Sequence, residues 1–128
     1  MQGGVGAASA EARLERAAKL RATGRFAEAA AAYAALVREH RGSTLSRTAL
    51  LSLAELQLSH LGQPAEALRS FEAYLAQRGP LAQEAHYGRI RALRQLGRQE
   101  AARAETERFL RDYPGSPQAE SLKAAPRY

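Results

Sequence analysis

Apolar and polar residues follow one another along the chain with the spacing of amphipathic helices, in segments separated by Gly, Ser and Pro. Residues three or four positions apart lie on one face of a helix, so each segment is expected to bury one face. The pattern predicts helices over about residues 10–23, 26–40, 44–60, 64–77, 80–96, 98–112 and 117–125. The aromatic residues expected in the core are Tyr33, Phe71, Tyr74 and Phe109, and Leu36 and Leu110 accompany them at helical spacing. The predicted fold class is therefore all-α.

Three glycines divide these helices into pairs. Gly24, Gly62 and Gly97 are spaced by 38 and then 35 residues, and each lies between two helical segments. Glycine adopts positive φ without steric cost, which ends one helix and lets the chain reverse. Five residues after each glycine lies an alanine, whose small side chain lets two helices touch: Ala29, Ala67 and Ala102. The hairpins expected from this pattern cover about residues 10–43, 44–79 and 80–116.

The helix starts carry recognisable capping residues. Ser9 is expected to cap the first helix, and the small residues 1–8 before it are expected to form a flexible tail ahead of a single domain over 9–125. The later starts are marked by Ser43, Pro64, Pro80, Ser116 and Pro117. Proline suits the first helical turn because its missing N–H has no partner there. The last helix, over about 117–125, is expected to close the end of the stack.

Together these features resemble the tetratricopeptide repeat, in which a helix, a Gly, an aromatic residue, Glu-Ala and a second aromatic residue precede a closing Pro. The resemblance covers about residues 10–116 in three units that are in register. The matching residues are Gly24, Phe26, Glu28, Ala29 and Tyr33, then Gly62, Ala67 and Phe71, then Gly97, Ala102, Phe109 and Pro114. Thr106 stands where the third unit would have its aromatic residue. The resemblance implies a right-handed solenoid of three antiparallel hairpins with a C-terminal capping helix.

In proteins of this family the first helix of each hairpin lines a concave groove that receives a segment of a partner. Carried over position by position, the resemblance places Leu14, Ala18, Arg21, Leu51, Glu55, Leu58, Tyr87, Arg91 and Arg94 in that groove. Such a groove suits an amphipathic peptide with an acidic side. The alternative for Leu51 and Leu58 is that they pack against neighbouring helices.

Composition narrows the class of protein further. Ala, Leu, Arg and Glu make up 75 of the 128 residues, and β-branched residues are scarce, which argues against any sheet. The chain has no Cys, which excludes disulfides and thiolate metal sites. No uncharged apolar run approaches the ~18 residues that a membrane-spanning helix needs.

The sequence shows no set of side chains that is spaced to converge on an active site. His40, His60 and His86 have no partner at the i, i+3 or i+4 spacing of a helical metal site. Glu105 and Glu107 are two residues apart, so their carboxylates point away from each other. We expect no enzymatic activity, no metal, no cofactor and no small-molecule substrate.

The formal net charge is +6, and the last 48 residues carry nine Lys and Arg against six acids. Arginines gather on the third hairpin at positions 89, 91, 94, 98, 103, 108 and 111. Acids at helical spacing, among them Glu100, Glu105, Glu107 and Asp112, favour a solvated face of ion pairs. The alternatives are an acidic partner or an anionic lipid surface, and nucleic acid, which usually needs interleaved aromatic residues.

The leading functional hypothesis is a non-catalytic module that binds another protein. One alternative is a domain that self-associates or forms the soluble part of a larger membrane-anchored envelope or regulatory protein. Another is binding to nucleic acid or an anionic surface through the third hairpin. Residues 109–120 resemble the repeat ends of bacterial envelope proteins, which favours a periplasmic location; no signal or membrane segment is visible in the chain.

Overall fold

The computed structural model describes residues 2–124, with side chains from Ser9 onward, and this part of the chain is helical without a strand. The helices are α1 (Gln2–Ala22), α2 (Phe26–Glu39), α3 (Thr44–Ser59), α4 (Pro64–Ala76), α5 (Ala82–Gln95), α6 (Gln99–Asp112) and α7 (Pro117–Ala124). The predicted fold class is confirmed. The helix ends agree with the prediction to within about two residues, apart from the start of α1. Residue 125, where the last helix was expected to end, lies outside the described residues.

Two predicted helix starts are wrong. The helix α1 begins at Gln2, so Ser9 lies within it and the expected flexible tail is helical from residue 2. Extending an existing helix adds one hydrogen bond per residue, whereas only the first turn carries the nucleation cost. Pro80 precedes α5 and does not begin it. The N–H of the next residue, Leu81, donates to the Tyr74 hydroxyl at 2.9 Å, which holds this segment in a turn.

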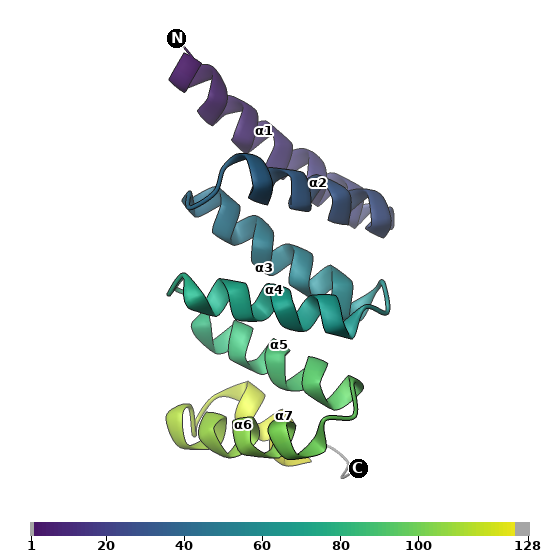
Figure 1. The fold of residues 1–128 in the computed structure, drawn as a ribbon, viewed down its shortest axis with the longest axis vertical. Helices are drawn as coiled ribbons and strands as arrows, with labels where there is room; N and C mark the ends of the chain where they lie inside the picture. The colour runs from purple at the N-terminus through teal and green to yellow at the C-terminus, as the bar shows by residue number, and fades with distance from the viewer. Residues whose placement is uncertain (1, 125–128) are drawn as a thin grey trace.

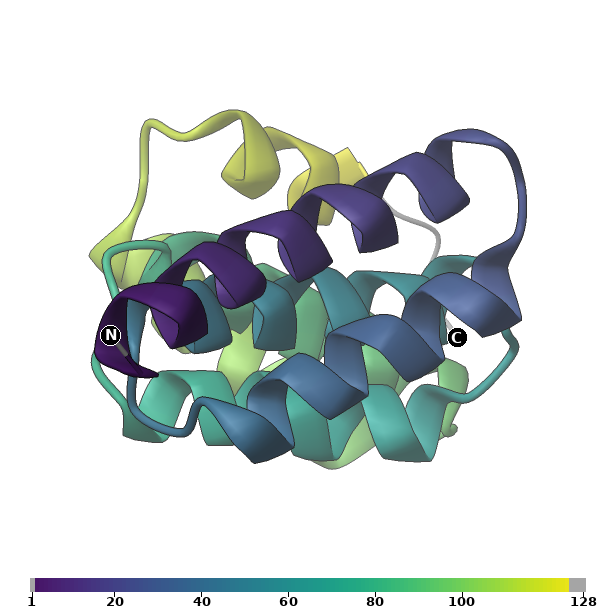
Figure 2. The same ribbon diagram turned by 90° about the horizontal axis from the view of Figure 1, so that it is seen from above.

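The helices stack in sequence order down the length of the molecule, as antiparallel hairpins with the N-terminus at one end and α7 near the other (Figure 1). Each helix packs against the next in the chain, and α3 also contacts both α1 and α5. Viewed along the stack, the hairpins overlie one another (Figure 2). The fold is a tetratricopeptide-like solenoid in which α1, α3 and α5 form one layer.

The three hairpin glycines have left-handed backbone conformations. Gly24, Gly62 and Gly97 have φ of +81°, +62° and +74°, and a Cβ at any of them would be strained. Two other helix starts are capped by serine, as predicted. Ser43 Oγ accepts the N–H of Ser46 at 3.0 Å, and Ser116 Oγ accepts that of Ala119 at 3.0 Å.

The core consists of successive clusters, one at each of the two junctions between hairpins and one where α7 packs on the last hairpin. The alanines at the three repeat positions, Ala29, Ala67 and Ala102, are buried where helices touch. The large side chains Tyr33, Phe71 and Phe109 are buried in separate clusters, the last together with Ile90, Ala119 and Leu122. Each cluster joins only neighbouring helices, as expected for a stack whose units cannot bury a core alone.

One close contact between helices involves a glycine that the sequence pattern does not single out. A Cβ at Gly88, in the middle of α5, would lie 2.2 Å from Cζ of Phe71. The fully buried Phe71 ring of α4 therefore rests directly on the backbone of α5. Any side chain at residue 88 would force the two helices apart.

We predict that Gly88→Ala lowers the free energy of unfolding by about 1–3 kcal/mol, because overpacking outweighs the gain in helix propensity of about 1 kcal/mol. Urea or thermal denaturation followed by circular dichroism measures the change. In a Phe71→Leu background the same substitution should cost less, since the ring that it meets is gone. A Gly88→Ala protein at least as stable as the wild type would contradict this account of the contact.

Candidate interaction surface

The layer formed by α1, α3 and α5 carries a surface on which polar and apolar side chains from two helices meet. We call the central part of it the odd-helix face and define it by Leu51, Glu55 and Ser59 of α3 with Tyr87 and Arg91 of α5. Leu51, Glu55, Tyr87 and Arg91 are half-buried and Ser59 is exposed. Leu51 packs against the core cluster around Phe71 and Tyr87 against the cluster around Phe109, so the face lies at the edge of the buried sides of α3 and α5.

Arg91 contacts three of the other residues of this face. Its Nη1 lies 3.4 Å from Glu55 Oε1, and its Nη2 donates to Ser59 Oγ at 3.1 Å. The guanidinium carbon lies 5.6 Å from the centroid of the Tyr87 ring, within the range of a cation–π contact. The Arg91 and Glu55 side chains are each 32% exposed. The arginine is thus held in one place by three partners while part of it stays open to solvent.

Most of the residues assigned by resemblance do lie at the surface of this layer. Leu14 and Leu51 are half-buried and pack with one side against the core clusters. Arg21 is half-buried in the last turn of α1, and Ala18 is exposed one turn before Ala22.

One assignment needs correction. Leu58 is 3% exposed and belongs to the core cluster around Phe71, so it packs against neighbouring helices. Arg94 is half-buried, and its Nη2 lies 3.4 Å from Thr106 Oγ1 on α6. Thr106 is the residue that replaces the third aromatic of the repeat pattern, and its hydroxyl gives Arg94 a partner that a Phe would not offer.

The hydroxyl groups of this face were missed in the sequence. Thr48 and Ser52 precede Glu55 on the same side of α3, and Ser59 follows it one turn later. Ser59 accepts a hydrogen bond from Arg91, and Thr48 donates to the Thr44 carbonyl at 3.2 Å. The signal that would have found them is the helical spacing of the polar residues of α3, which occupy positions between its buried residues.

A second polar group connects α4, α5 and α6. Arg89 lies 3.2 Å from Glu72 and 3.1 Å from Glu105, and Glu105 also lies 3.5 Å from Arg108. Part of the arginine cluster is therefore paired with acids, as the spacing suggested. Among the side chains that the structure describes, Arg98, Arg103 and Arg111 make no ion pair and are exposed.

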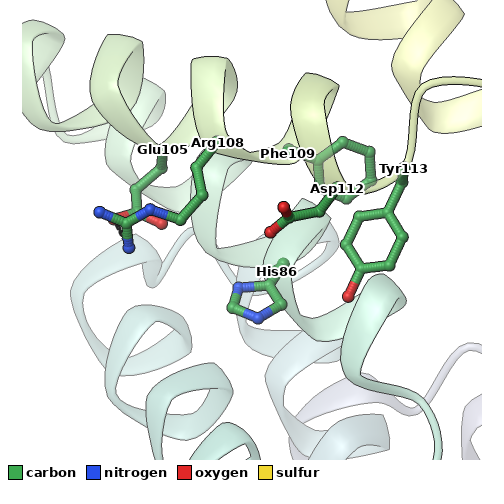
Figure 3. A pocket seen from close by; sticks show the side chains of 6 residues that line it. All are labelled: His86, Glu105, Arg108, Phe109, Asp112 and Tyr113. Atoms are coloured by element: carbon green, nitrogen blue, oxygen red, sulfur yellow. Dashed lines mark ion pairs between the residues drawn. The ribbon is translucent and has the colours of Figure 1, made fainter.

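A small pocket lies beside this network, between α5 and α6, and is lined by His86, Glu105, Arg108, Phe109, Asp112 and Tyr113 (Figure 3). The Asp112 carboxylate points toward the His86 ring. Burial lowers the pKa of His86 below its ordinary value, and Arg89 and Arg108 lower it further, while Glu105 and Asp112 oppose the shift. Within residues 9–124 no three His, Asp or Glu side chains are placed to hold a metal ion.

A tetratricopeptide repeat family model matches residues 60–117, from the end of α3 to the start of α7. Residues 60–117 are therefore assigned to the tetratricopeptide repeat family. The first hairpin, outside the matched residues, has the same glycine turn and the same buried alanine and aromatic residue. A search of curated proteins gives no match.

Tetratricopeptide repeats are in general modules for protein–protein interaction and are not catalytic, so the family supports the functional class expected from the sequence. Over residues 2–124, no helix is long and apolar enough to cross a membrane.

The lowered pKa of His86 predicts a pH-dependent contribution to stability. The unfolded chain binds the proton more readily than the folded protein, because 6.5 is the ordinary value and the folded value lies below it. The stability that neutral His86 contributes to the folded protein is fully present above pH 6.5. It is lost as the pH falls through the pKa of His86 in the folded protein. In His86→Gln this loss should disappear, whereas in the exposed His60→Gln it should persist. Denaturation at a series of pH values measures it, and parallel profiles for wild type and His86→Gln would contradict the assignment.

Proposed function

We propose that this protein is a non-catalytic module that binds a segment of a partner protein across the odd-helix face. The observation that supports this most directly is the cluster around Arg91, which joins α3 to α5 at the surface. It lies on the helices that line the binding groove in the family that the sequence resembles.

The composition of the cluster suits a binding site. Tyr and Arg are the residue types enriched among those that dominate binding energy at protein interfaces. Arg91 and Tyr87 already contact each other, so less side-chain freedom is lost when a partner binds. Leu51 and Tyr87 each precede a member of the ion pair by one helical turn and add apolar surface beside it.

The network on α4, α5 and α6 has a different character. Arg89 and Glu105 have two charged partners each, and the Glu105 side chain is only 14% exposed. Both charges are therefore satisfied by neighbouring helices. This network suits a group of ion pairs that stabilises the stack, and it supplies a control for the odd-helix face.

We predict that Arg91→Ala weakens partner binding by about 30-fold or more, since the loss of an interface hot spot costs about 2 kcal/mol or more. Arg89→Ala, two residues away on the same helix, should leave binding unchanged. The measurement is quantitative affinity capture from a lysate of the source organism, with wild type and both variants compared in parallel and their folding checked by circular dichroism.

Proteins lost with Arg91→Ala and retained with Arg89→Ala would support the proposal. Equal retention or equal loss with both variants would refute the assignment to the odd-helix face. Sedimentation at several concentrations tests self-association, and a dimer that is disrupted by Arg91→Ala would assign this face to a second copy of the chain.

We place the module in the periplasm as part of the same proposal, supported by the likeness of residues 109–120 to envelope-protein repeat ends. Cell fractionation with antibodies to the chain tests the location, and recovery in the cytoplasmic fraction would contradict it.

A further inference from the structure

The odd-helix face contains an arginine whose charge is already balanced. Arg91 is paired with Glu55 and bonded to the uncharged Ser59, and its third neighbour is the Tyr87 ring. The five residues that define the face therefore have a formal charge of zero, although the whole chain carries +6. The excess positive charge of the protein lies elsewhere.

The surroundings of this ion pair are also uncharged on the α3 side. Thr48, Leu51 and Ser52 occupy the preceding turns. On α5, the guanidinium of Arg94 contacts the Thr106 hydroxyl of α6 and not Glu55. No other arginine or lysine contacts Glu55 among the described side chains.

An acidic side chain that approached Arg91 would meet the Glu55 carboxylate at close range. Like charges repel, and the attraction that Arg91 offers is already shared with Glu55. A neutral acceptor such as a backbone carbonyl or an amide side chain does not meet this repulsion. The guanidinium has five N–H donors, of which the described contacts occupy those toward Glu55 and Ser59, so donors remain for such a group.

We infer that the partner segment is uncharged where it crosses α3 and α5, and that it places an apolar side chain against Leu51 and Tyr87 and a neutral oxygen on Arg91. Glu55 is the residue that sets this preference. The inference rests on the proposed function and replaces the acidic partner suggested by the sequence with one of neutral, amphipathic chemistry.

The test uses short random peptides displayed on phage and selected on the full chain. A selected peptide is remade with Glu at each position in turn, and its affinity is measured by fluorescence anisotropy for the wild type, Glu55→Gln and Glu72→Gln. Glu72 is a matched control because it also forms an interhelical pair with an arginine of α5, namely Arg89. Tyr87→Ala identifies the peptides that bind at the odd-helix face.

For the wild type we expect apolar peptides whose affinity changes by less than about twofold as NaCl rises from about 50 to about 500 mM. At the position facing Arg91, Glu should weaken binding to the wild type by about fivefold or more, corresponding to about 1 kcal/mol. Glu55→Gln should abolish that penalty, and Glu72→Gln should leave it intact.

Acidic peptides that need Tyr87, and whose affinity falls by about tenfold or more with salt, would overturn the inference while leaving the proposed function in place. An equal glutamate penalty in Glu55→Gln and wild type would also overturn it. Peptides that bind equally well to Tyr87→Ala, or the absence of any selected peptide, would count against the proposed function and the inference together.

Discussion

The close approach of neighbouring helices is the constraint on which this structure depends. The Phe71 ring lies against the backbone of α5 at Gly88, and small residues such as Ala67 and Ala102 occupy other points of contact. Because large side chains are buried junction by junction, residues 9–124 have no single central core. Small changes in side-chain volume at these points would alter the distance between helices and the register of the side chains above them.

The distance between neighbouring helices determines which of their side chains meet at the surface. Side chains on α3 and α5 that face away from the junction meet their neighbours only if the two helices keep their spacing. The pair of Glu55 and Arg91 is one result, and the bridge from Glu72 through Arg89 to Glu105 is another. Both connect successive hairpins, but in the first the arginine also contacts an aromatic ring and a hydroxyl group, which makes it the better candidate for binding.

Local signals predicted most of the fold. Glycines such as Gly62 and caps such as Ser43 act within a few residues, so the helix boundaries followed from the sequence. The start of α1 did not, because no strong stop signal precedes Ser9. Leu58 was misassigned because positions carried over from one repeat unit to another do not fix how α3 is turned against its neighbours, and one residue turns a helical side chain by about 100°. The contacts of Arg91 depend on the spacing between two helices, which no local pattern encodes.

The most direct test of the account is to map where a bound segment lies. Backbone and side-chain NMR signals of the isotope-labelled protein would be followed during titration with a peptide selected on the full chain. We expect the largest shifts at Leu51, Glu55, Tyr87 and Arg91, with little change on α2, α4 and α6. Shifts concentrated around Arg89 and Glu105, with those of Tyr87 and Arg91 unchanged, would contradict it.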